Sequence, residues 1–180
     1  MKRTLVFGSI AAVVLGLFAL AIIPQLVGAE EKMAMPFGGK DDVKFANKVW
    51  KAMDGYEKWV VKSEMMPGNS PHGKFIKVYY NVINIDKKPY HIIIKDNFTP
   101  EKELAAVTVM VQREDGYDSD NMNWFWVKYG PDGAISENDM KMAMAGRVAK
   151  GMDMGCIACH KAPPDGDYLF INNKGSYGNE

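Results

Sequence analysis

The sequence is poor in the side chains that most often carry metal or redox chemistry, with only 2 Cys and 3 His in 180 residues. It also has no excess charge, because 22 Lys and Arg balance 22 Asp and Glu, and no basic block is present. A nucleic-acid surface needs clustered Lys and Arg, so we expect no nucleic-acid partner. A disordered chain is excluded as well, because 47% of the residues are hydrophobic and only 24% are charged.

The first 29 residues have the pattern of a secretory signal peptide. Lys2 and Arg3 give a positive start, residues 9–20 form an apolar run, and residues 27–29 offer small side chains for cleavage. The alternative is an uncleaved membrane anchor, since residues 5–27 are long enough to span a bilayer. In either case we expect the rest of the chain to be exported, for example to a periplasm. Cleavage would leave 20 basic against 22 acidic side chains, a net charge of about −2.

Both Cys lie in one pentapeptide, Cys156-Ile157-Ala158-Cys159-His160. Two Cys in an exported protein would ordinarily suggest a disulfide. Here they are one helical turn apart and a His follows at once, which is typical of c-type haem attachment: the thiols bond to the two vinyl groups and the His ligates the iron. We therefore predict one covalent haem c, attached to Cys156 and Cys159, with His160 as the axial ligand.

Two other sites would use the same residues. A redox-active Cys-x-x-Cys normally follows a strand, and residues 150–155 do not have a strand pattern. A zinc site would need His72 or His91 as further ligands. The same two His are candidates for a sixth iron ligand, although a lone His more often has a structural role.

The chain after the leader has the pattern of an α+β domain. Residues 42–53 have apolar side chains at helical spacing, and Met140, Met144 and Val148 predict a second helix over residues 137–150. Between them lie four segments rich in β-branched and aromatic residues, which predict an antiparallel meander. The four segments are residues 74–81, 91–95, 105–113 and 123–129.

The Cys-x-x-Cys-His motif comes late in the chain. About 125 residues separate it from the leader and about 20 follow it. We therefore expect an antiparallel sheet with flanking helices, with the haem packed against the sheet and the attachment site closing the fold. As divisions of the chain we expect a flexible linker at residues 30–40, the haem domain at residues 41–171 and a polar tail at residues 172–180.

A series of further segments follows in a fixed order. They are Pro71-His72-Gly73, Val78-Tyr79-Tyr80-Asn81, Ile92-Ile93-Ile94-Lys95 with Asp96-Asn97-Phe98, Val107-Thr108-Val109-Met110, Asn123-Trp124-Phe125-Trp126, Gly155 with the haem motif, and Asp167-Tyr168-Leu169-Phe170. In this order and spacing the chain resembles the cytochrome P-460 family, which includes the cytochromes c-prime-beta. The resemblance covers about residues 40–171.

This resemblance implies an antiparallel sheet with flanking helices, often in a homodimer, and a five-coordinate haem iron with an open distal face. It also implies a small ligand such as NO or hydroxylamine. In the hydroxylamine-oxidising members a Lys is bonded to the haem ring, and Lys95 matches that Lys. Strand alternation puts Lys95 on the same face as His91 and Ile93.

The distal carboxylate that the resemblance implies for hydroxylamine oxidation has no match in this sequence. Thr108 aligns with it, and residues 105–112 contain no acid. Phe75 and Tyr79 are further candidates to line the distal pocket. Three functions stay open: a haem protein that binds a small nitrogen species, a hydroxylamine-oxidising oxidoreductase, and a periplasmic electron-transfer cytochrome. The last would need a redox partner protein.

Overall fold

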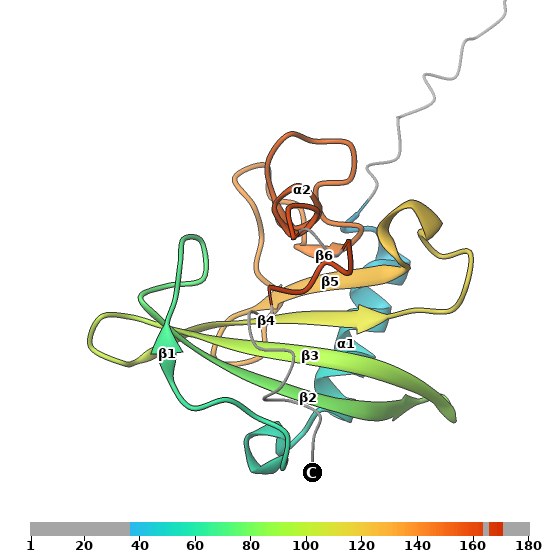
Figure 1. The fold of residues 1–180 in the computed structure, drawn as a ribbon. Coiled ribbons are helices and arrows are strands. Elements are labelled where there is room, and N and C mark those ends of the chain that lie inside the picture. Colours follow the sequence, from blue (N-terminus) through green and yellow to red (C-terminus); the bar gives the residue numbers. More distant parts are fainter. Residues whose placement is uncertain (1–36, 164–165, 171–180) are drawn as a thin grey trace, which may run out of the picture. The chain divides into compact units, whose positions relative to one another are not determined.

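The computed structural model describes residues 37–163 and 166–170, and it has an α+β fold (Figure 1). The expected leader, most of the linker and the polar tail lie outside these residues. The elements are α1 (Lys40–Ala52), η1 (Tyr56–Lys58), β1 (Met66–Pro67), β2 (Phe75–Ile85), β3 (Lys88–Phe98), β4 (Leu104–Gln112), η2 (Ser119–Asn121), β5 (Trp124–Tyr129), β6 (Ala145–Gly146) and α2 (Cys156–His160). None of the described helices is long and apolar enough to cross a membrane.

The six strands form one antiparallel sheet in chain order, β1 to β6. The four predicted strands are β2 to β5, and the predicted helix over residues 42–53 is α1. β2 and β3 are longer than predicted because a two-residue turn joins them. Asp86 and Lys87 have φ values of +52° and +66°, the left-handed conformation that lets both strands continue up to a tight hairpin.

The prediction of a second helix over residues 137–150 is wrong. The segment instead returns along β5 and ends in β6. The Lys128 N–H donates to the Met144 carbonyl at 3.0 Å, and the Ser136 N–H donates to the Lys128 carbonyl at 2.8 Å. These bonds satisfy the backbone groups that a helix would have paired internally. Gly146 has a φ of +108°, which is outside the helical region.

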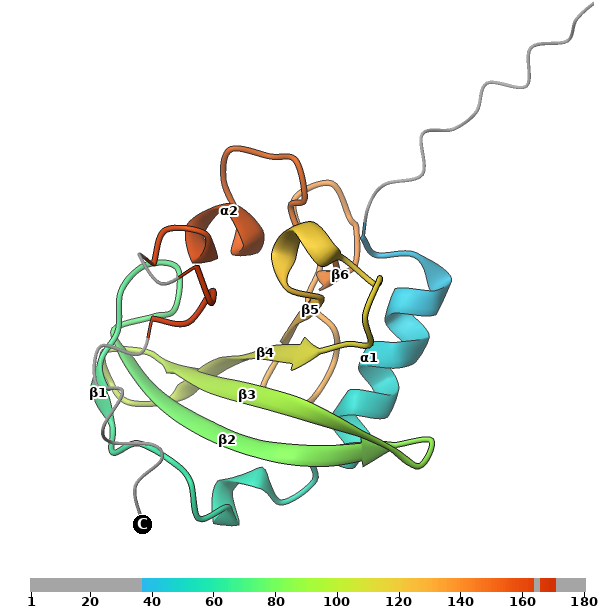
Figure 2. The ribbon, with the colours of Figure 1, turned by 45° about the vertical axis from the view of Figure 1, so that its right-hand side comes forward.

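The two helices lie on opposite faces of the sheet (Figures 1 and 2). On one face, α1 packs against alternate side chains of the strands, including Ile92 and Ile94, which are fully buried. On the other face, Ile93 and Trp126 form a second apolar cluster with Ile157 of α2. Apolar side chains therefore cover both sides of the central strands, as expected for strands buried between two layers.

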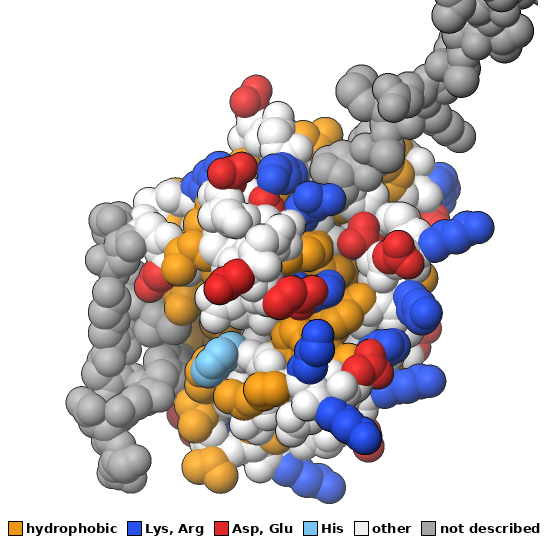
Figure 3. Space-filling model, turned by 90° about the vertical axis from the view of Figure 1, so that its right-hand side faces the viewer, with side chains coloured by type: hydrophobic (Ala, Val, Ile, Leu, Met, Phe, Trp, Pro, Cys, Tyr) orange, Lys and Arg blue, Asp and Glu red, His pale blue; other side chains and the backbone are white. Residues whose placement is uncertain are grey.

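The face that carries α2 is only partly covered. On β2, Tyr79 points toward α1 and is 3% exposed, whereas Tyr80 and Val82 on the other side are 37% and 43% exposed. β2 contributes only the half-buried Val78 to the apolar cluster around α2. Figure 3 shows one side of the molecule on which apolar side chains lie open among charged ones. The sheet therefore leaves apolar surface uncovered on the α2 side.

The turn after β5 joins the sheet to α1. The Gly133 N–H donates to the Gly130 carbonyl at 3.0 Å, and Gly133 has a φ of +83°. The indole ring of Trp50 packs directly on Gly133, so that a Cβ atom there would collide with it. The Tyr129 hydroxyl donates to the Ala46 carbonyl at 2.7 Å, which ties the end of β5 to the middle of α1.

Candidate functional site

The short helix α2 presents both Cys side chains. The Cys159 N–H donates to the Gly155 carbonyl at 3.0 Å, which closes the helical turn that separates the two thiols. Both are free thiols, with Cys156 half-buried and Cys159 exposed. Burial raises the pKa of the Cys156 thiol to about 11, so it is uncharged at neutral pH. Ile157 is 2% exposed and anchors the helix in the apolar cluster beside the sheet.

His160, the last residue of α2, is buried, and its imidazole has a single tautomer. Its Nδ1 lies 2.6 Å from the Tyr168 carbonyl oxygen. Because a carbonyl oxygen only accepts, Nδ1 carries the hydrogen and Nε2 has a free lone pair. The rings of Trp126 and Phe170 lie 4.7 and 5.1 Å from the imidazole. Burial lowers the pKa of His160 to about 4, so the ring is neutral, the form that ligates metal.

Tyr168 is itself held by a series of polar contacts. Its hydroxyl donates to Asn121 Oδ1 at 3.0 Å, and Asn121 Nδ2 donates to Asp118 Oδ2 at 2.8 Å. Asp118 is 3% exposed and forms an ion pair with Lys150. These contacts fix the segment whose carbonyl orients His160. No spacing in the sequence predicts them, because they join three separate loops.

Three polar side chains form a row across the sheet on the α2 side. Lys95 of β3 pairs with Thr108 of β4, and Thr108 pairs with Lys128 of β5. Lys95 is half-buried, and burial lowers its pKa. Within residues 37–163 and 166–170 its ammonium forms no ion pair. The predicted position of Lys95 on this face is therefore correct, and Thr108 lies beside it.

His72 also lies on this face, from the loop between β1 and β2. Its Nδ1 is 3.1 Å from Asn97 Oδ1 and 3.4 Å from Thr108 Oγ1. Its ring centroid is 6.1 Å from that of His160, with the two planes almost perpendicular at 89°. Burial, with smaller effects from Lys95 and His160, lowers the pKa of His72 to about 4. In the sequence His72 is a candidate metal ligand and part of the Pro-His-Gly segment, and neither predicts its contact with Asn97.

The two aromatic candidates are not brought to this face. Tyr79 belongs to the core packed on α1, and Phe75 lies four residues before it on the same strand, so both point away from the face of Lys95. The structure therefore does not place these two aromatic residues beside Lys95, and their role in a distal pocket stays a prediction. His91 is exposed, and its Nδ1 is 2.7 Å from the Tyr80 hydroxyl.

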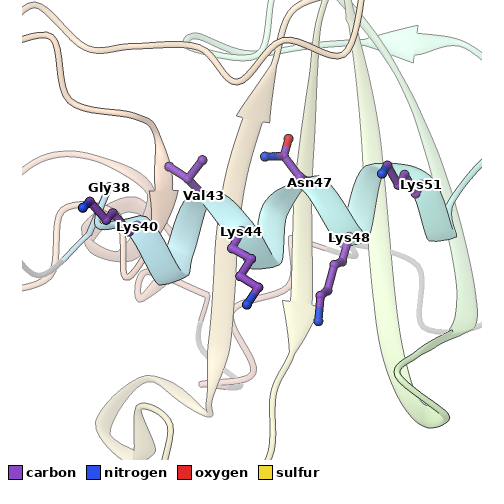
Figure 4. A pocket seen from close by; sticks show the side chains of 7 residues that line it. All are labelled: Gly38, Lys40, Val43, Lys44, Asn47, Lys48 and Lys51. Atoms are coloured by element: carbon purple, nitrogen blue, oxygen red, sulfur yellow. The ribbon is translucent and has the colours of Figure 1, made fainter.

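A hollow of about 520 Å³ lies on the solvent side of α1, away from α2 (Figure 4). Its lining residues are Gly38, Lys40, Val43, Lys44, Asn47, Lys48 and Lys51. These side chains include neither a thiol nor an imidazole, so the hollow is not part of the α2 site. Among the described residues, no group of three or more His, Cys, Asp or Glu side chains is placed to hold a metal ion.

The residues on the α2 side fit a haem. Two free thiols lie beside an imidazole with a bare nitrogen, and the neighbouring sheet face has uncovered apolar surface for a large flat group. The indole N–H groups of Trp124 and Trp126 are buried on this side without a hydrogen-bond partner among the described residues, which is rare unless a further group is present. This set of donors is typical of a c-type haem protein.

A comparison with protein families supports the same class. The family model named Cytochrome P460 matches residues 53–171, which include all six strands and α2. The chain belongs to the cytochrome P460 family and is a c-type haem protein of that family. Searches of curated proteins and of solved structures found no match. The resemblance inferred from the ordered segments is therefore confirmed.

Proposed function

We propose that this protein is an exported mono-haem cytochrome that binds or redox-transforms a small nitrogen species, NO or hydroxylamine. A bound haem supplies an iron that can hold such a ligand and exchange electrons with it. The observation that carries the proposal is the state of His160: its Nδ1 is committed to the Tyr168 carbonyl, and its bare Nε2 lies next to two free thiols.

The side chains of α2 have distinct roles in holding the haem. The thiols of Cys156 and Cys159 would hold the haem by adding across its two vinyl double bonds, sulfur to one carbon and hydrogen to the other, so that nothing leaves. His160 Nε2 would be the ligand of the iron. The hydrogen bond to the Tyr168 carbonyl fixes the orientation of the imidazole and makes it a more basic ligand.

The sheet face supplies the surroundings of the open side. Lys95 is half-buried and forms no ion pair with the described residues, so its amine is available to a group held next to this face. Thr108 stands where the resemblance implies a carboxylate, so β4 provides no acid to receive ligand protons. Any base that serves a protic ligand must therefore come from another element.

The absorption spectrum of the purified ferric and ferrous protein tests this function. We expect a high-spin, five-coordinate iron whose spectrum shifts when NO or hydroxylamine is added. A low-spin, six-coordinate spectrum that neither compound changes would favour the alternative, a periplasmic electron-transfer cytochrome. His91→Ala is the control, because His91 is exposed and bonded to Tyr80, and the spectrum of this variant should equal that of the wild type.

A proteolytic digest defines the role of Lys95. If Lys95 only lies near the haem, its peptide is recovered at its unmodified mass, and the haem stays with the peptide of Cys156 and Cys159. Recovery of the haem joined to both peptides would instead demonstrate the lysine–haem bond of the hydroxylamine-oxidising members. Steady-state oxidation of hydroxylamine with an electron acceptor then separates turnover from binding.

The proposal that the protein is exported rests on the predicted signal peptide at residues 1–29. Cleavage after residue 29 predicts that the mature protein begins at Glu30. N-terminal sequencing of the protein from the exported fraction tests this. A mature chain that still carries residues 5–27 would instead support the membrane anchor.

A further inference from the structure

The segment that bears α2 is attached to one loop on both of its sides. Before α2, the Lys150 ammonium forms an ion pair with Asp118 Oδ1. After α2, the Tyr168 hydroxyl donates to Asn121 Oδ1 at 3.0 Å. Asp118 and Asn121 both belong to the loop between β4 and β5 that contains η2. The chain that carries the two thiols and His160 is therefore held, before and after α2, by the same short loop.

Asp118 is the residue at which the two attachments meet. Its side chain is fully buried, and its two oxygens have different partners: Oδ1 accepts from Lys150, and Oδ2 accepts from Asn121 Nδ2 at 2.8 Å. A hydrogen bond to an ionised carboxylate is roughly twice as strong as a neutral one. Because Asn121 Nδ2 donates to Asp118, the amide oxygen is the atom that faces the Tyr168 hydroxyl. Asp118 therefore fixes the orientation of the amide that holds Tyr168.

Tyr168 passes this restraint on to His160. Its carbonyl oxygen accepts from His160 Nδ1 at 2.6 Å, so one residue contains both the hydroxyl that is held and the carbonyl that holds the imidazole. Its ring also lies 6.4 Å from the ring of Trp126, which in turn lies 4.7 Å from the imidazole. A displacement of the Tyr168 side chain would therefore disturb two neighbours of the imidazole at once.

We infer that Asp118 is a positioning residue for the axial ligand of the haem: it holds, through Asn121, the tyrosine whose carbonyl keeps His160 Nδ1 hydrogen-bonded. The inference rests on the proposed function, in which His160 Nε2 ligates the iron. A firm hydrogen bond at Nδ1 makes the imidazole a more basic ligand, which stabilises the ferric state. Asp118 therefore lowers the reduction potential of the haem, although it forms no hydrogen bond with His160 itself.

The reduction potential of the haem-loaded protein tests this inference, because Lys150 and Asp118 have opposite charges. If the ion pair holds Tyr168 in place, Asp118→Asn and Lys150→Met both weaken the hydrogen bond at Nδ1. Each should then raise the equilibrium constant for haem reduction by about threefold, part of the effect of one ordinary hydrogen bond. If the two residues acted only by their charge across space, Asp118→Asn would raise the potential and Lys150→Met would lower it. Lys150→Arg keeps the ion pair and should retain the wild-type potential.

A double-mutant cycle identifies the path of the effect. In the Tyr168→Phe background the hydroxyl that binds Asn121 is absent, so Asp118→Asn should no longer change the potential. If Asp118→Asn yields too little protein, Lys150→Met in the same background takes its place. Shifts of opposite sign in the two single variants, additive shifts in the cycle, or no shift at all would overturn the role of Asp118 and leave the proposed function intact.

The exposed ion pair of Lys48 with Asp86 is the matched control. Lys48→Met and Asp86→Asn remove the same two charges from α1 and from the hairpin between β2 and β3, and neither should change the potential. The absorption spectrum of His160→Gly separates the inference from the proposed function. A haem iron with the wild-type spectrum in this variant would show that His160 is not its ligand, and it would overturn both.

Discussion

The imidazole of His160 donates a hydrogen bond from Nδ1 to the carbonyl oxygen of Tyr168, at 2.6 Å. This bond joins the last residue of α2 to a segment that follows it by only eight residues. The Tyr168 side chain reaches in the other direction, to Asn121 beyond β4. The segment around Tyr168 is therefore a clamp that connects His160 to the loop around η2.

Tyr168→Phe should loosen this clamp. The variant loses the hydroxyl that donates to Asn121 at 3.0 Å, so the carbonyl that faces His160 is held less firmly. We expect a loss of about 1 kcal/mol in the free energy of unfolding. We also expect a higher haem reduction potential, because a weaker hydrogen bond makes His160 a less basic ligand. Denaturant titration and potentiometry followed by absorbance measure the two effects.

Tyr117→Phe is the matched control for this variant. It removes a buried hydroxyl that has no hydrogen-bond partner among the described residues. Its free energy of unfolding should stay the same or rise, and its potential should not change. If Tyr168→Phe behaves like this control in both measurements, the clamp does not act on His160.

Substituting each Cys alone, and then both together, should show whether two thioether bonds hold the haem. Cys156→Ser and Cys159→Ser should each keep the haem through the remaining thioether, and the double variant should release it under denaturing conditions. Intact mass and a haem stain after denaturing electrophoresis measure this. A double variant that keeps its haem through denaturation would show that another side chain carries a covalent bond, and Lys95 is the first to examine.

Asp96→Asn should change how stability depends on pH. Asp96 is 4% exposed on the α1 side, and burial raises its pKa, although hydrogen bonds from Tyr56 and Tyr79 act in the opposite direction. The folded protein therefore binds this proton more tightly than the unfolded chain does. The associated stability is complete below the unfolded pKa of about 3.9 and is lost as the pH rises through the folded value.

The measurement is urea unfolding of both proteins at several pH values between 4 and 7. The wild type should lose stability relative to Asp96→Asn as the pH rises, because the amide has no proton to release. The variant can still accept from one tyrosine hydroxyl and donate to the other. A difference that is constant across this range would mean that Asp96 has the same pKa in the folded and unfolded states.

Gly133→Ala should be clearly more destabilising than Gly116→Ala. Both glycines have positive φ, +83° and +88°, so both substitutions carry a backbone cost of about 1–2 kcal/mol. At Gly116 a Cβ atom has no neighbour within 4 Å, whereas at Gly133 it meets the indole of Trp50. Overpacking adds about 1–3 kcal/mol there. Equal losses in thermal or denaturant unfolding would show that Trp50 can move aside freely.

The sheet could be predicted from the sequence because its signal is local. Alternation in the run from Ile92 to Lys95 was enough to assign Lys95 to one face, and the pairing of β3 with β4 confirms that face beside Thr108. The second helix could not be predicted correctly. Met140 and Met144 have helical spacing, but Met140 is 59% exposed, and the segment takes its hydrogen bonds from Lys128 of β5.

Only part of the candidate site could be predicted from the sequence. Cys156 and Cys159 belong to a contiguous motif, so their proximity follows from the chain itself. The contact of His72 with Asn97 instead depends on the loop before β2, in which Gly73 has a positive φ, and no spacing in the sequence predicts it. Tyr79 is a pocket candidate in the sequence because it is aromatic. Side chains alternate along a strand, however, and the side chain of Tyr79 packs on the α1 face.

The cluster buried around α1 has one further consequence, for the order of events during biosynthesis. Among the described residues, its last buried member is Ala145, which precedes Cys156, the first Cys of α2, by eleven residues. A chain that emerges N-terminus first has therefore delivered every part of that core before its thiols appear. The sheet and α1 can serve as a finished scaffold, and prosthetic-group insertion becomes the closing step of maturation.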